Sequence, residues 1–422
     1  MALRMHRIDW PRFQSDDRGP RCASAALVMV SLAFVLAACA PRTAGMEARK
    51  EADDRFRRTT SLVSFDQAKQ AFEAGDLAKA RKDIEAAIAR SDREARYWSL
   101  LGRVELESKR LERAIDAFAK SIECDPALAE PYYYRGIVYQ RWSDSEKAIA
   151  DYLKASELAP ERAAYLLAAA EIMVAERRLD DARMLLLPKL AYFEHNASMH
   201  ELLGDVASLQ GEYAAAARSY ERALVIDTEA PLLAEKLVSS YFAAGEWQRA
   251  LEAARRGREA LAKAPTGRRV QVPNDLYRFE GRSLARLGRM AEARQVFVEE
   301  TRAYPEDAEA WRDLATASLT SGDIARAEQA AERLVVLAPQ DARAFTLRGI
   351  VAERRNNFGE AVRWHRLAVA RGPEQVEALI GLGLALEKSG KQSEALEVLA
   401  KAMKLDPAST LARRAFAGVS TD

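Results

Sequence analysis

Few side chains in this 422-residue chain have the type and spacing that chemistry requires. The chain has three cysteines and four histidines, with no cysteine pair at metal-site spacing. It contains neither the His-Glu-x-x-His motif of zinc hydrolases nor the Gly-x-Ser-x-Gly turn that presents a nucleophilic serine. Ser389-Gly390-Lys391 matches only the end of a phosphate-binding loop, because Ala385 and Gln392 replace two required residues. The sequence predicts no catalytic residue, no metal site and no cofactor.

Cys39 lies in a context that predicts covalent modification. Five arginines within the first 21 residues precede an apolar run over 22–40, which contains Leu36-Ala37-Ala38-Cys39. This ending resembles the lipobox of bacterial lipoprotein signal peptides. The resemblance implies that residues 1–38 are a signal peptide, cleaved before Cys39, and that the Cys39 sulfur carries a lipid. The alternative is an uncleaved transmembrane anchor, since about 20 apolar residues span a membrane.

Either interpretation places the rest of the chain outside the cytoplasm. Ala40 follows the cysteine, and Gram-negative lipoproteins retained in the inner membrane usually have aspartate there, so the resemblance implies an outer-membrane anchor facing the periplasm. Residues 39–60 are polar and charged, and we interpret them as a tether, with a short charged helix over 47–58 as the alternative. Cys22 would be removed with the signal peptide and Cys39 would be lipidated. Cys124 then has no cysteine left for an intramolecular disulfide, and we expect it to be a packed thiol.

A recurring alanine organises the remainder of the chain. It recurs every 34 residues, with one step of 43, at Ala80, Ala114, Ala148, Ala182, Ala216, Ala250, Ala293, Ala327, Ala361 and Ala395. If this alanine is position 20 of each unit, positions 4, 7, 8 and 11 share one helical face and positions 20, 24 and 27 share another. Each unit is therefore predicted to be a helix pair that buries its apolar faces by stacking on its neighbours.

Small residues occur at fixed places within the unit. Position 8 is mostly glycine and position 20 is always alanine, so the paired helices are expected to approach closely there. Position 15 is glycine in most units, which is typical of the left-handed residue that ends a helix. Proline at position 32 in six units ends the second helix.

The second unit shows the full pattern. It has Trp98, Leu101 and Gly102 at positions 4, 7 and 8, then Phe118 at position 24 and Pro126 at position 32. This pattern resembles the tetratricopeptide repeat family over ten units. The resemblance implies an all-α, right-handed solenoid of helix-turn-helix repeats with a concave binding face. On this basis the chain after the tether divides into repeats one to six over 61–264, an inserted loop over 265–273, repeats seven to ten over 274–409, and a C-terminal cap or tail over 410–422.

Three units depart from this pattern, of which the first lacks the aromatic residue and the Leu-Gly pair. Pro188 lies inside the second helix of the fourth unit, and Val238 and Gly257 are atypical in the sixth, so we expect kinks or weaker packing there. The inserted loop is either an inert connection or a basic binding loop carried by two arginines, Arg268 and Arg269. Asn274 and Asp275 are predicted to cap the following helix.

The same resemblance selects candidate binding residues. In the family, positions 2, 5, 9, 12 and 13 of the first helix line the concave groove. The acidic candidates are Glu171, Glu201, Asp205 and Glu235, and the basic candidates are Arg278, Arg282, Arg286 and Arg312. A groove acidic in the middle and basic toward the C-terminal half would orient a charged, extended ligand. Charges on a helix are also common on a merely solvated face, and that alternative stays open.

Composition limits the class of partner. With 64 basic and 63 acidic residues, the chain has no large field that would attract nucleic acid. We therefore expect a non-enzymatic scaffold at the bacterial cell envelope, which binds a peptide segment or a folded protein and no small-molecule substrate. One alternative is an assembly lipoprotein of a pilus or secretion system, and another is a recruiter or regulator of cell-wall hydrolases.

Overall fold

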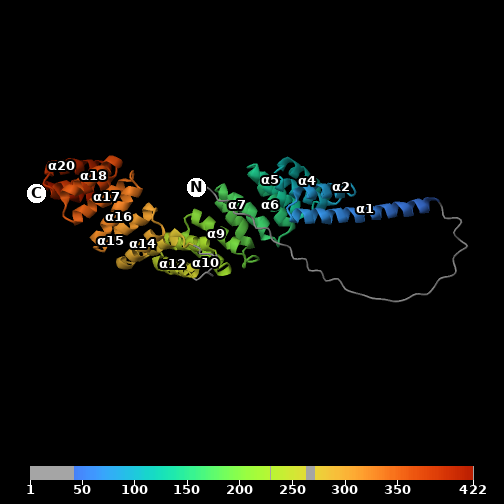
Figure 1. The fold of residues 1–422 in the computed structure, drawn as a ribbon, viewed down its shortest axis with the longest axis horizontal. Helices are drawn as coiled ribbons and strands as arrows, with labels where there is room; N and C mark the ends of the chain where they lie inside the picture. The colour runs from blue at the N-terminus through green and yellow to red at the C-terminus, as the bar shows by residue number, and fades with distance from the viewer. Residues whose placement is uncertain (1–41, 229, 263–270, 422) are drawn as a thin grey trace.

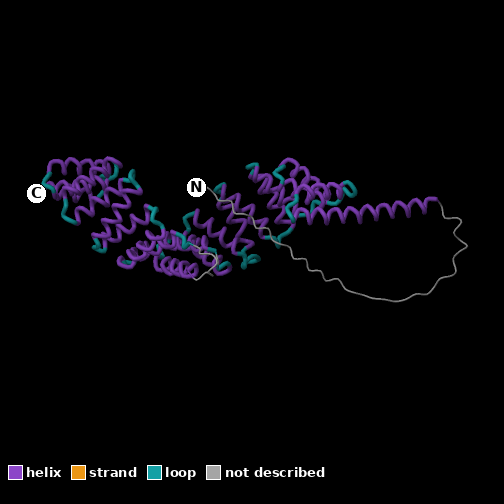
Figure 2. Tube along the Cα trace, viewed as in Figure 1, coloured by secondary structure: helices purple, strands orange, loops and turns teal. Residues whose placement is uncertain are grey.

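The computed structural model describes residues 42–228, 230–262 and 271–421. Within these ranges the backbone forms α-helices joined by short turns, with one 3₁₀-helix and no β-strand (Figure 2). The predicted signal peptide, Cys39 and most of the inserted loop lie outside the described residues. In the described part, no helix is both long enough and apolar enough to span a bilayer.

The helices alternate between two sets. The first helices of the units are α1 (Arg42–Glu73), α3 (Ala95–Glu107), α5 (Ala129–Arg141), α7 (Ala163–Ala175), α9 (Ala197–Leu209), α11 (Pro231–Ala243), α13 (Asn274–Arg286), α15 (Ala308–Thr320), α17 (Ala342–Arg354) and α19 (Val376–Lys388). The second helices are α2 (Leu77–Ile88), α4 (Leu111–Cys124), α6 (Ser145–Leu158), α8 (Leu179–Leu186), α10 (Tyr213–Ile226), α12 (Trp247–Ala262), α14 (Met290–Ala303), α16 (Ile324–Leu337), α18 (Phe358–Arg371) and α20 (Gln392–Leu405). The last helix is α21 (Thr410–Thr421), which packs against α19 and α20.

The first helices begin in the register that the alanine spacing predicts. From α3 to α11 they start 34 residues apart, the step from α11 to α13 is 43 residues, and the 34-residue spacing then resumes. Every alanine at position 20 is fully buried. The structure therefore confirms the helix-pair repeat.

The small residue at position 8 allows close packing against position 24 of the second helix. A Cβ added to Gly102 would overlap the Phe118 ring, and one added to Gly136 would overlap the Tyr152 ring. Four further pairs have the same arrangement: Gly204 with Tyr220, Gly281 with Phe297, Gly349 with His365, and Gly383 with Leu399. The interior is thus close-packed through glycine in each of these units.

Position 15 adopts the left-handed conformation even where it is not glycine. Gly75 has a φ of 80° and Asn356 a φ of 61°. Lys109, Ser143 and Arg177 hold the same position with φ values of 60°, 60° and 64°. The turn between the paired helices therefore requires this backbone geometry whatever the side chain.

Neighbouring first helices pack against each other along the inner side of the array. Contacts join α7 to α9, α11 to α13, and α17 to α19, whereas successive second helices contact each other little in the described ranges. The array is elongated and curved, with α1 at one end and α20 at the other (Figure 1). The first helices consequently form the inner face on which the candidate binding residues lie.

The described part of the predicted tether is helical rather than extended. Residues 42–60 belong to α1, which continues without a break into the first repeat (Figure 1). Residues 45–59 are exposed, so tertiary packing does not hold them in place. Alanine, glutamate, lysine and arginine favour helix, and the packed turns of α1 supply a nucleus from which the helix extends. The alternative of a charged helix is therefore the better description of these residues.

Of the predicted irregularities, the one at Pro188 is confirmed and the one at Gly257 is wrong. α8 ends at Leu186 and a 3₁₀-helix over Leu187–Lys189 follows, because proline lacks an N–H and cannot continue an α-helix. By contrast, α12 runs unbroken through Gly257, where a small residue fits beside Leu276 of α13.

Two other predictions are corrected. Asn274 and Asp275 do not cap α13: Pro273 is the capping residue and provides no side-chain bond, while the Asn274 amide donates to Asp307. Cys124 is exposed rather than packed, since it is the last residue of α4 and lies off the buried face formed by positions 20, 24 and 27.

Candidate binding groove

The predicted acidic residues of α9 lie beside a lysine of the next unit. The Nζ atom of Lys236 is 2.8 Å from Glu201 Oε1 and 2.8 Å from Asp205 Oδ1. The hydroxyl of Tyr220 also donates to Asp205 over 2.7 Å. Glu171, on α7, is exposed and lies outside this cluster. The acidic centre of the groove is therefore partly neutralised from within the chain.

Arg278 is held by carboxylates of its own helix and of the next two segments. Its guanidinium lies 2.9 Å from Asp275 Oδ1 and 2.6 Å from Asp307 Oδ2. Its Nε is 3.7 Å from Glu300 Oε1 in α14. A groove arginine with this many carboxylates around it carries little free positive charge.

Arg282 and Arg312 are paired in the same way. Arg282 donates to Asp313 Oδ2 over 2.6 Å and to Glu309 Oε2 over 3.2 Å. Arg312 lies 2.9 Å from Glu309 Oε1. Arg278, Arg282 and Arg312 are thus part of a network that joins α13 to α15, and the role of the predicted basic residues in binding a ligand stays a prediction.

Glu235 and Arg286 differ from these pairs. Glu235, on α11, is half-buried and has no ion pair or hydrogen bond to another described residue. Burial, and secondarily the charge of Asp275, raises the pKa of Glu235. Arg286, at the end of α13, is exposed, and its guanidinium carbon lies 5.9 Å from the centre of the Trp247 ring with no carboxylate partner among the described residues.

Apolar side chains lie between these charges. The rings of Phe242 (α11) and Phe279 (α13) are 5.3 Å apart at a tilted angle, and both are half-buried. Leu209 of α9 and Leu232 of α11 are exposed at groove positions. The ring pair is therefore partly exposed apolar surface in the groove, and the two leucines add exposed apolar side chains at separate groove positions, of the kind that protein partners cover.

Sequence reasoning missed Glu300, the most deeply buried carboxylate of this region. Its side chain is fully buried in α14, and neither carboxylate oxygen has a hydrogen-bond partner. Burial raises its pKa to about 8, against the opposing charge of Arg278. Glu300 stands at position 27, where nearby units have alanine, glycine or leucine, and that exception in the repeat was the available signal.

Comparison with repeat-family models agrees with this architecture. A tetratricopeptide repeat model matches residues 65–129, 174–231, 235–308, 280–342, 312–375 and 346–410, and a second such model matches 117–150. The chain belongs to the tetratricopeptide repeat family. Members of this family generally act as protein-interaction scaffolds, and the fold is typically non-enzymatic.

Solved structures of other tetratricopeptide proteins are similar to parts of the chain. YrrB, described as a TPR protein with an unusual peptide-binding site, is 21% identical, covers 47% of this chain and 98% of its own, and has a TM-score of 0.39. The APC/C hetero-tetramer Cut9–Hcn1 is 11% identical, covers 90% of this chain and 94% of its own, with a TM-score of 0.43. MamA from Desulfovibrio magneticus RS-1 is 21% identical, covers 43% and 97%, with a TM-score of 0.38. No curated protein matches the chain.

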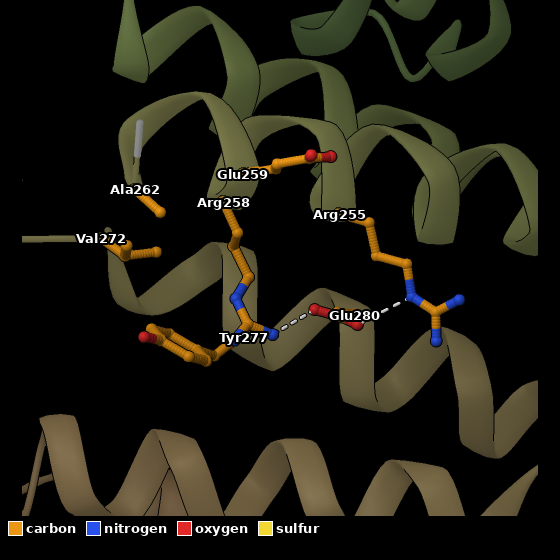
Figure 3. A pocket seen from close by; sticks show the side chains of 7 residues that line it. All are labelled: Arg255, Arg258, Glu259, Ala262, Val272, Tyr277 and Glu280. Carbon is orange, nitrogen blue, oxygen red and sulfur yellow. Dashed lines mark hydrogen bonds and ion pairs between the residues drawn. The ribbon is translucent and has the colours of Figure 1, made fainter. Parts of the chain in front are cut away.

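A hollow of about 320 Å³ lies on the other side of α13, between its tetratricopeptide positions 4 and 7 and the end of α12. Arg258 lies over the Tyr277 ring, 4.0 Å from its centre, and both Arg258 and Arg255 bind Glu280 (Figure 3). Because these charges satisfy one another, the hollow is a weaker candidate than the groove. No group of three or more potential metal ligands occurs among the described residues.

Proposed function

We propose that this tetratricopeptide protein is a non-enzymatic scaffold that binds a peptide segment or a folded partner on the inner face of α9 to α15. The observation that carries this proposal is the half-buried ring pair of Phe242 and Phe279, which lies across the boundary where α11 and α13 pack against each other. Leu209 and Leu232 are exposed at other groove positions of the same face. Apolar side chains left exposed there gain free energy when a partner removes them from water.

The ion-pair network supports a rigid surface rather than a flexible one. Arg282 joins α13 to α15 through Asp313 and Glu309. Lys236 joins α11 to α9 through Glu201 and Asp205. A surface held in one shape loses less entropy on binding than one that must be ordered first.

We further propose that a lipid on Cys39 holds this scaffold at the cell envelope, in the outer membrane facing the periplasm. The α1 residues before the first repeat would then act as a helical spacer, since 19 helical residues extend about 28 Å. In this setting the partner is an envelope protein. Assembly of a pilus or secretion channel predicts a membrane pore protein as partner, and control of the cell wall predicts a hydrolase.

The deciding experiment is crosslinking in the protein's own cells. A photoreactive amino acid replaces Leu232 in the groove, and a matched variant carries it at Arg222, which is exposed on the second helix α10. We expect a specific envelope protein to be captured from position 232 and not from position 222. Equal capture from both positions, or none from position 232, contradicts the groove assignment.

The anchor is tested separately by labelling cells with radioactive palmitate. We expect the wild-type chain to carry the label and to sediment with membranes. Cys39→Ala should lose the label and remain the uncleaved, larger precursor, which the apolar run over 22–40 keeps in the membrane. A labelled Cys39→Ala chain, or one that is still shortened to begin near residue 39, contradicts the lipid anchor.

A further inference from the structure

On the inner face of α9 to α15, most groove-position charges are matched within the chain. Glu201 and Asp205 are paired with Lys236. Arg278 is paired with Asp275 and Asp307. The remaining matched set is Arg282, Glu309, Arg312 and Asp313. These side chains hold the solenoid together and offer little net charge to a ligand.

Glu235 and Arg286 are the groove charges in this stretch that lack an opposite charge among the described residues. Glu235 is nevertheless half-buried, so its charge is deprived of water without a compensating partner. An unmatched anion and an unmatched cation therefore face the groove from neighbouring first helices.

The repeat register sets the spacing of these two charges. Glu235 holds position 5 of α11 and Arg286 position 13 of α13. Phe242 at position 12 of α11 contacts Phe279 at position 6 of α13, so α13 is displaced along its axis by several positions relative to α11. The separation along the axis is therefore about 18 Å, and adjacent helices lie about 9 Å apart, so the two Cα atoms are separated by roughly 20 Å. An extended peptide covers that distance in about six residues.

The aromatic pair lies between the two charges. Phe242 holds position 12 of α11 and Phe279 position 6 of α13, so both fall between positions 5 and 13 along the groove. Their rings are 5.3 Å apart across the boundary between the two helices. The order along the surface is thus anion, apolar ring pair, cation.

We propose that the groove recognises an extended peptide segment with a lysine or arginine at one end, apolar side chains in the middle, and an aspartate or glutamate at the other end, the two charges enclosing a segment of about six residues. Glu235 pairs with the basic side chain and Arg286 with the acidic one, while the ring pair of Phe242 and Phe279 receives the apolar side chains. This inference rests on the proposed function and adds the chemistry of the partner.

The electrostatics of Glu235 agree with this assignment. Burial and the nearby charge of Asp275 raise the pKa of its carboxyl, which means that the ionised form is disfavoured in the unbound chain. A cation placed beside the carboxylate reverses that penalty. The planar guanidinium of Arg286 can donate two parallel hydrogen bonds to one carboxylate.

The test uses synthetic peptides with the full-length chain in detergent. Three twelve-residue peptides share Gly-Ser flanks and differ only in their centres: Lys-Leu-Phe-Leu-Leu-Glu, the reversed Glu-Leu-Leu-Phe-Leu-Lys, and the uncharged Gln-Leu-Phe-Leu-Leu-Gln. Binding is measured by fluorescence anisotropy for the wild type and for Glu235→Gln/Arg286→Gln, which removes the two charges. The control, Arg222→Gln/Glu397→Gln, removes charges at exposed positions on second helices.

We expect the wild-type chain to bind the charged peptides about tenfold more tightly than the uncharged one, since two partly exposed ion pairs together contribute about that factor. The variant without the two charges should lose this preference, and the control should behave as the wild type does. Equal affinity of the wild type for charged and uncharged peptides, or an unchanged preference in the variant, contradicts the pairing of the peptide's charges with Glu235 and Arg286.

The outcomes also separate this inference from the proposed function. If the uncharged peptide binds as well as the charged peptides do, peptide binding is confirmed, and the pairing of peptide charges with Glu235 and Arg286 is contradicted. If no peptide binds, recognition of an extended segment is contradicted, whatever partner the crosslinking at Leu232 identifies.

Discussion

The Nε atom of Arg278 lies 3.7 Å from Oε1 of Glu300, and neither atom has a hydrogen-bond partner. Arg278 comes from α13 and Glu300 from α14 of the same unit, while the remaining guanidinium nitrogens bind Asp275 and Asp307. A fully buried carboxylate at this separation is not well compensated, because the cost of removing it from water is large. The stability of the chain should therefore depend on the charge of Glu300 and on the charge of Arg278.

Replacing Glu300 with glutamine should change how stability depends on pH. Burial raises the pKa of Glu300 to about 8 from the ordinary 4.5. Between those values the folded chain holds a proton that the unfolded chain has released, so this group's contribution to stability falls as pH rises through that window. Glu300→Gln removes the fall. We expect the variant to be more stable than the wild type near pH 8, by an amount on the order of a few kcal/mol.

Urea unfolding followed by circular dichroism from pH 5 to pH 9 measures this difference. Arg278, Arg282, Asp307 and Asp313 surround the group and are the same in both chains. The control is Glu397→Gln, at an exposed position, which should not alter the pH profile. Parallel profiles for wild type and Glu300→Gln would show that Glu300 is ionised across the whole range.

Charge reversal should lower the free energy of unfolding at Arg278 and leave it nearly unchanged at Arg286. Arg278→Glu removes the partner of four carboxyl groups and adds a fifth, so we expect a loss of about 3–5 kcal/mol in the free energy of unfolding. Arg286→Glu breaks no ion pair among the described residues and should change stability by less than about 0.5 kcal/mol. Thermal melts of the two variants test this, and similar melting temperatures for both would mean that the Arg278 pairs contribute little.

Features that repeat along the chain can be predicted from the sequence, whereas many features that occur at one place cannot. The helix pairs, the buried alanine at position 20 and the left-handed position 15 recur every 34 residues, so sequence alone locates them. The pairing of Arg282 with Asp313 depends on residues of two units and on side-chain rotamers. Arg282 was selected from its position within one unit, and that position does not predict its partner in the next unit. For residues 42–60 the sequence left a tether and a short charged helix open, because exposed residues show no apolar period that would decide between them.

The last prediction concerns the turn between α7 and α8. Arg177 has a φ of 64°, a conformation that costs a residue with a Cβ about 1 kcal/mol or more relative to glycine. Its side chain is exposed, so replacing it disturbs no packing. Arg177→Gly should therefore raise the free energy of unfolding by about 0.5–1 kcal/mol, after allowing for the greater freedom of glycine in the unfolded chain. Arg177→Ala is the matched control, because alanine removes the same charge but keeps the Cβ. Urea unfolding of the three chains at one pH decides the matter. If alanine stabilises as much as glycine does, the gain comes from removing the arginine charge and not from relieving the backbone at position 15.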